Sequence, residues 1–108
     1  MTADLILRAR RPNAIAAMSD ELAAGALRAL DATGLHVPVE VALTGWDDAD
    51  AARTLGITTV AQSMRRQGAA CARQALTGSD TDFSDQWQII ERASTHVHAR
   101  NTGDADLE

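Results

Sequence analysis

Side chains that can hydrogen-bond to a polar ligand follow apolar runs at three places in this 108-residue sequence. They are Met-Ser-Asp at 18–20, Trp-Asp-Asp at 46–48 and Ala-Gln at 61–62. Hydroxyl and amide groups both donate and accept hydrogen bonds, whereas ionised carboxylates accept strong, charge-assisted ones. These groups could hold a small polar molecule together if the fold brings the three segments to one place.

Catalysis is not expected from these residues. Asp47 and Asp48 could be considered as an acid–base pair, but adjacent residues rarely converge on one substrate atom. No nucleophile motif, glycine-rich phosphate loop or metal motif accompanies them. His36, His96 and His98 do not converge with a cysteine or paired carboxylates at ligand spacing, so we expect neither a metal site nor a cofactor.

The composition limits the partners and the compartment. The formal net charge is −5 and the sequence contains no lysine, which disfavours direct binding to nucleic acid. Arg65 and Arg66 form too small a basic cluster to change this expectation. No apolar run is long enough to span a bilayer, and Leu5-Ile6-Leu7 is too short for the apolar part of a signal peptide. Cys71, the single cysteine, suits a reducing cytoplasm, and we interpret it as inert packing on an apolar helical face.

Apolar runs and capping residues predict alternating helices and strands. Ser19 and Ser63 are typical N-caps, and Gly34 and Gly78 are typical helix stops. Helices are predicted at 3–10, 20–30 and 64–76, and these caps and stops mark the ends of the second and the third. Strands are predicted at 14–18, 41–43, 58–60 and around 89–90.

This order predicts an α/β fold, with a mostly parallel sheet and helices on both faces. The runs 14–18 and 41–43 are apolar throughout, which predicts strands that are covered on both sides. Asp47 or Asp48 could cap a further short helix that runs to about Thr54. In such sheets, ligands bind at the carboxyl ends of strands, and all three polar segments lie at such ends.

Four blocks of sequence resemble the lactose-repressor family of bacterial transcription regulators. The first is Arg-Pro-Asn-Ala-Ile at 11–15, which is followed by the helical segment at 18–30. The second is Gly-Leu-His-Val-Pro at 34–38, which leads into Gly-Trp-Asp-Asp at 45–48. The third is Ile-Thr-Thr-Val-Ala-Gln at 57–62, similar to the strand that crosses the hinge in that family. The last is Arg-Ala-Ser-Thr at 92–95, and all four occur in the family's order and spacing.

The resemblance implies part of a type I periplasmic-binding-protein-like effector domain, in which a sugar or nucleoside binds between two subdomains. Residues 1–100 would be its C-terminal subdomain, and 101–108 a polar tail outside the fold. Asp47 matches the family's ligand-binding aspartate, Gln62 a cleft-facing position, and Trp46 an aromatic beside the aspartate. Ser19 stands where the family often has asparagine, and this difference leaves the ligand class open.

The resemblance also implies the partners. DNA would be bound only through an N-terminal helix-turn-helix headpiece, which this sequence lacks. The helix at 20–30 would lie at a homodimer interface, where Ala23, Ala24, Ala26 and Leu27 are small or apolar enough for close contact. The alternative is the C-terminal lobe of a sugar-transport binding protein. A helix-turn-helix or a secretion signal upstream in the reading frame would distinguish the two.

Overall fold

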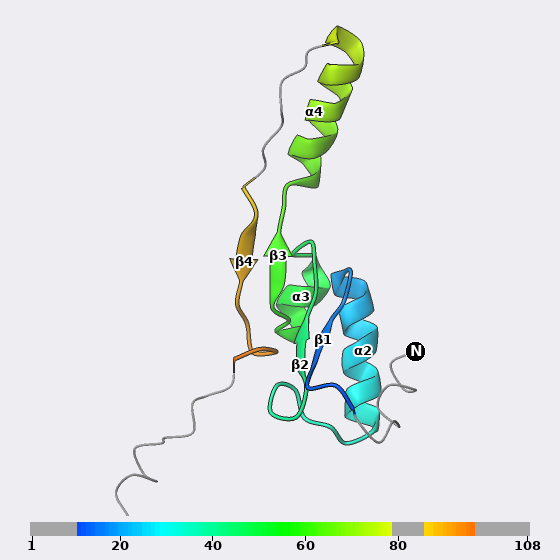
Figure 1. Cartoon of the computed structure of the whole chain (residues 1–108), viewed down its shortest axis with the longest axis vertical. Coiled ribbons are helices and arrows are strands. Elements are labelled where there is room, and N and C mark those ends of the chain that lie inside the picture. The colour runs from blue at the N-terminus through cyan, green and yellow to red at the C-terminus, as the bar shows by residue number, and fades with distance from the viewer. Residues whose placement is uncertain (1–10, 79–85, 97–108) are drawn as a thin grey trace, which may run out of the picture.

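The computed structural model describes residues 11–78 and 86–96. The predicted helix at 3–10 and the predicted tail at 101–108 lie outside the described residues. Figure 1 shows the arrangement of the elements. Their bounds are β1 Ala14–Ala16, α2 Asp20–Ala32, β2 Ala42–Thr44, α3 Asp50–Leu55, β3 Thr59–Ala61, α4 Met64–Thr77 and β4 Gln88–Ile90.

The two longer helices begin at the predicted residues and end one or two residues after the predicted ends. The Ser19 hydroxyl accepts a hydrogen bond from the amide of Leu22 at the start of α2, which satisfies one of the amides that lack a helical partner. Ser63 caps α4 in the same way, accepting from the amide of Arg66. Gly78 ends α4 in the left-handed conformation that glycine adopts without strain.

The predicted cap of the short helix α3 is wrong. The N-cap position is Ala49, and no side chain caps the helix there. Asp47 and Asp48 instead form the turn before α3, both with positive φ. Their carboxylates bind other segments, because this turn directs them away from the amides that begin α3.

The strands form the expected mostly parallel arrangement. β1 pairs with β2 in parallel, and single parallel bridges, Thr44 with Thr58 and Asp47 with Ala61, connect β2 and the turn after it to the β3 segment. β4 then pairs with β3 in the antiparallel sense, with Val60 opposite Ile89. Three parallel connections and one antiparallel edge strand confirm the α/β class.

The core is small and aliphatic, and it lies where α2 packs on α3 and on β2. Leu43 and Ile57 are its largest members, surrounded by Ala23, Ala26 and Ala52. The low aromatic content made such a core of small side chains necessary. β1 does not meet the expectation of cover on both faces, because Ala14 and Ala16 are exposed in this chain.

Helix α4 lies apart from this core and extends away from α2 and α3 (Figure 1). None of its residues is buried, and Met64 and Leu76 are 64% and 86% exposed. The interpretation of Cys71 as packed inside the fold is therefore wrong, since the cysteine is exposed. The physical reason is that β3 carries the chain out of the layer formed by α2 and α3, so α4 has no layer to pack against in the described part of the chain.

Candidate ligand-binding site

The turn after β2 is fixed by three consecutive backbone amides that each donate to another segment. The amide of Asp47 donates to the carbonyl of Val60 at 3.0 Å. The amide of Asp48 donates to the hydroxyl of Thr59 at 3.2 Å, and that of Ala49 donates to the carboxylate of Asp20 at 2.6 Å. The turn is thus connected both to β3 and to the start of α2.

These bonds compensate for an unfavourable backbone conformation. Asp47 has φ of 106° and Asp48 has φ of 56°. Residues other than glycine seldom adopt positive φ, although aspartate tolerates it better than most. Such conformations cost on the order of 1–3 kcal/mol each and persist only where the surroundings impose them. Their occurrence at adjacent acidic residues marks this turn as a candidate functional site.

The side chains of Asp47 and Gln62, which follow the ends of two strands, meet in the structure. Gln62 Nε2 donates to Asp47 Oδ1 at 2.7 Å, and Gln62 Oε1 accepts from Gln67 Nε2 at 3.0 Å. The chain of amides orients the donor toward the carboxylate. Within the described part of the chain, Asp47 Oδ2 has no hydrogen-bond partner, so it can accept a bond from a ligand.

Ser19 lies near the turn but takes a structural role in this structure. Its hydroxyl caps α2 through the amide of Leu22. The next amide, that of Asp20, donates to the carbonyl of Trp46 at 3.0 Å, which brings the two segments side by side. Ser19 is only partly buried, and its hydroxyl contacts neither Asp47 nor Gln62 in the described hydrogen bonds.

Trp46 packs against a second tryptophan that sequence reasoning did not include in the site. The rings of Trp46 and Trp87 meet edge to face, with centroids 5.5 Å apart and planes at 80°. Such a pair is the arrangement that the ring quadrupoles favour. Trp87 is 62% exposed, which leaves an aromatic surface beside the polar turn. The signal that could have found it is its place directly before the predicted last strand.

Asp48 takes a structural role as the partner of Arg92. Its Oδ1 forms a salt bridge with Arg92 Nη2 at 2.7 Å, and both side chains are about four-fifths buried. Arg92 Nη1 also donates to the carbonyl of Ile57 at 3.0 Å. Asp48 Oδ2 lies 3.6 Å from Arg53 on α3. Asp47, which has no arginine partner in the described part of the chain, is thereby left as the carboxylate available to a ligand.

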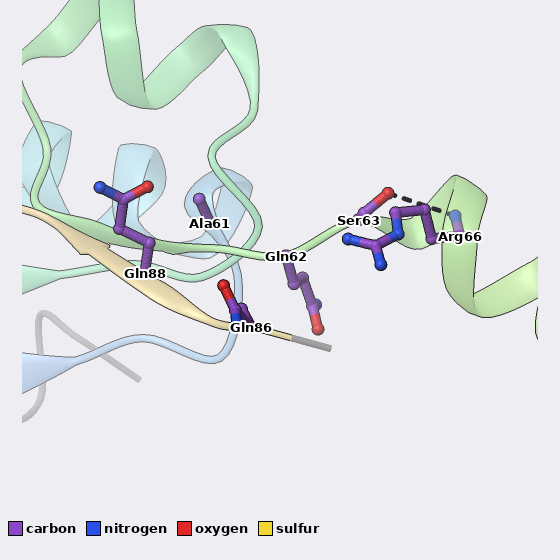
Figure 2. Close-up of a pocket in the computed structure, with 6 residues that line it drawn as sticks. All are labelled: Ala61, Gln62, Ser63, Arg66, Gln86 and Gln88. Atoms are coloured by element: carbon purple, nitrogen blue, oxygen red, sulfur yellow. Dashed lines mark hydrogen bonds between the residues drawn. The ribbon is translucent and has the colours of Figure 1, made fainter. Parts of the chain in front are cut away.

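Next to Gln62, the structure has an open hollow of about 330 Å³ where the chain leaves β3 and enters β4 (Figure 2). Its lining includes three glutamine side chains, one hydroxyl and one guanidinium: Ala61, Gln62, Ser63, Arg66, Gln86 and Gln88. Such groups suit hydroxyl, amide or carboxyl functions of a small molecule. Among the residues that the structure describes, no group of three or more potential metal ligands is found.

Comparison with known proteins identifies the class. The model of the periplasmic binding protein-like domain matches residues 2–97. The HTH-type transcriptional repressor PurR of Erwinia tasmaniensis is 32% identical over 102 residues, which are 93% of this chain and 30% of that repressor. The chain therefore spans about a third of the length of the curated relatives it matches.

Comparison with solved structures gives the same result as the sequence comparison. A LacI family transcriptional regulator from Lactobacillus casei with bound sucrose has a TM-score of 0.72 and 30% identity, covering 86% of this chain and 38% of that one. The lac repressor dimer bound to operator has a TM-score of 0.74 at 23% identity, over 89% of this chain and 31% of that one, and supports the fold alone.

The chain belongs to the periplasmic binding protein-like domain family, and it is similar to the corresponding part of transcription regulators of the lactose-repressor family. The resemblance found in the sequence is confirmed. The named relatives are transcriptional repressors and not enzymes. No helix in the described ranges has the length and apolar character needed to cross a membrane.

Proposed function

We propose that this chain is the effector-sensing part of a bacterial transcription regulator, and that it binds a sugar or nucleoside-like molecule at the turn after β2. The observation that carries the proposal is the Asp47 carboxylate, which is held on a fixed turn, oriented by Gln62 and open at Oδ2. A preorganised carboxylate accepts strong hydrogen bonds from ligand hydroxyls without losing side-chain freedom on binding.

The surroundings support a polar ligand with an apolar face. Gln62 offers both a donor and an acceptor, and Ser19 offers a hydroxyl at the neighbouring helix start. Trp46, with Trp87 against it, supplies an aromatic wall. The regulator from Lactobacillus casei has been solved with sucrose, glucose and TRIS, which are all rich in hydroxyl groups. These observations favour a hydroxyl-rich effector.

The remaining parts of the proposal concern the domain, the partners and the cellular compartment. Residues 1–100 would form the C-terminal subdomain, and DNA would be contacted through a headpiece that is not in this sequence. The regulator would act in the cytoplasm, where it can reach the chromosome. The named relatives favour this reading over a lobe of a transport protein, because they are repressors.

The experiment that tests the proposal is a titration of the isotope-labelled chain with glucose and with sucrose, followed by NMR. We expect chemical shifts to change at 46–49, at Gln62 and at the Trp46 indole, with dissociation constants in the millimolar range. Affinity is weak because the ligand is buried on one side only, and buried contact supplies most small-molecule affinity.

Two aspartates provide the matched comparison. Asp47→Asn should weaken binding by roughly tenfold or more, the effect of losing a hydrogen bond to a charged group. Asp50→Asn removes the same charge three residues away, where the side chain is 98% exposed, and should leave binding unchanged. Equal effects of the two variants, or shift changes confined to other surfaces, would contradict the proposal.

A further inference from the structure

The carboxylate of Asp20 is buried where three segments meet. Its side chain belongs to the first turn of α2, and the residue is only 1% exposed. Oδ2 accepts a hydrogen bond from the amide of Ala49 at 2.6 Å, and Oδ1 accepts one from the hydroxyl of Thr59 at 2.7 Å. One side chain therefore connects the start of a helix, the turn that carries Asp47, and strand β3.

The charge on Asp20 is stabilised without a cation in the described part of the chain. Two donors converge on its oxygens, and the residue lies at the N-terminus of a 13-residue helix, whose dipole favours negative charge. A buried carboxylate held in this way is rigid, because leaving either oxygen unpaired in the interior costs free energy.

The local sequence is adapted to this carboxylate. A Cβ atom at Gly45 would lie 2.2 Å from Asp20 Oδ1, so any other residue there would displace the carboxylate or the strand end. Thr59 relays the contact, because its hydroxyl donates to Asp20 while it accepts from the amide of Asp48. Two of the three amides that fix the turn thus depend on Asp20, directly or through Thr59.

We infer that Asp20 is the positioning residue of the site: it holds the positive-φ turn in the one conformation that presents the Asp47 carboxylate to Gln62 and to the effector. Asp20 does not contact the ligand itself, because it is buried beneath the turn. The inference rests on the proposed function for its biological meaning. The structural part of the inference is that the geometry of Asp47 depends on Asp20. This dependence can be measured without a ligand.

The test uses Asp20→Asn, which keeps the size of the side chain but replaces one acceptor oxygen with a donor. Amide hydrogen exchange in the labelled chain reports on the turn, and the nuclear Overhauser effect between the Gln62 side-chain amide and the Asp47 β protons reports on the geometry of the site. We expect exchange at Asp48 and Ala49 to rise at least about tenfold more than at buried amides of α2 such as that of Leu30, and the Overhauser effect to be lost.

Two further variants keep the inference falsifiable if Asp20→Asn fails to fold. Thr59→Val removes the relay hydroxyl at nearly constant volume and should loosen the same amides, whereas Thr59→Ser keeps the hydroxyl and should restore them. Ser94→Ala is the control for general destabilisation. Ser94 is 4% exposed and hydrogen-bonds to Leu43 and Thr58, away from the turn. The Ser94→Ala variant should accelerate amide exchange without removing the Overhauser effect between Gln62 and Asp47.

A uniform rise of exchange in all amides, or an Overhauser effect that survives both Asp20→Asn and Thr59→Val, would overturn the inference. Failure of the proposed function gives a different result. In that case the turn would still loosen in these variants, while Asp47→Asn would leave glucose and sucrose binding unchanged.

Discussion

The side-chain amide of Gln62 donates to the carboxylate of Asp47 at 2.7 Å, although the two residues are 15 positions apart. One follows β3 and the other follows β2, and a parallel bridge between Asp47 and Ala61 sets them beside each other. The bond therefore depends on the register between the two segments. A shift of one residue would reverse the direction of each side chain and separate the pair.

Replacing Gln62 tests whether it orients Asp47. Gln62→Leu keeps a side chain of similar size but removes the donor, so the Asp47 side chain should populate several rotamers. Because both residues are partly exposed, the loss of stability should be only about 0.5–1.5 kcal/mol. Three-bond couplings of the Asp47 β protons measure the rotamers. Gln67→Leu removes the outer bond of the chain but leaves the Gln62 donor to Asp47 in place, so it should have the smaller effect; the reverse order would refute this assignment.

The sequence predicted the elements well because their signals are local. The caps Ser19 and Ser63 and the stop Gly78 depend on a few neighbouring residues, and each is found as expected. The meeting of Asp47 and Gln62 was also predictable, since the carboxyl ends of neighbouring parallel strands share one edge.

What the sequence did not show depends on contacts between distant segments. Asp20 resembled an ordinary acid in the first turn of a helix, because its burial arises only when Gly45 and Thr59 close over it. The reversal of the turn at Asp47 and Asp48 was missed for the same reason, and a helix cap was expected instead. Trp87 was missed because its partner, Trp46, lies far away in the sequence.

The Arg92–Asp48 salt bridge should stabilise the fold far more than the exposed pair on α3. Arg92→Met leaves Asp48 about four-fifths buried without its closest cation and also removes a bond to the carbonyl of Ile57. We expect a loss of about 2–4 kcal/mol in the free energy of unfolding, measured in urea. Arg53→Met is the control. Its side chain is 59% exposed, and exposed pairs contribute at most about 1 kcal/mol, so similar losses in the two variants would contradict this ranking.

The chain by itself should not bind duplex DNA with sequence preference. Its formal net charge of −5 opposes binding to a polyanion, and its arginines do not form a long basic cluster in the sequence. Gel-shift assays with a pool of random duplexes at physiological salt should show no selected sequence. Enrichment of a particular duplex by the isolated chain would show that the proposed division of labour with a separate headpiece is wrong.

Self-association through the β1 and α2 side of the molecule is the last prediction. The sequence suggested Ala23, Ala24, Ala26 and Leu27 as the contact surface, but this assignment needs correction. Ala23 and Ala26 are buried in the core against Leu43, because α2 turns this face toward β2, and they are not available to a second chain.

The exposed apolar groups on this side lie instead at Ala14 and Ala16 of β1, at Met18 and at Leu22 of α2. Met18 and Leu22 are 85% and 59% exposed, and within the described residues β1 pairs only with β2, so its outer edge is open. An open strand edge next to apolar side chains is a surface that a second copy can cover.

Sedimentation equilibrium at tens of micromolar should therefore give about twice the chain mass of 11.5 kDa. Leu22→Glu places a charge in the contact and should shift the protein toward the monomer. The matched control is Leu76→Glu, because Leu76 is 86% exposed on α4, away from this surface, and its replacement should leave the mass unchanged. A monomeric wild-type chain would refute the prediction. Dissociation by Leu76→Glu but not by Leu22→Glu would show that the contact lies on α4 instead.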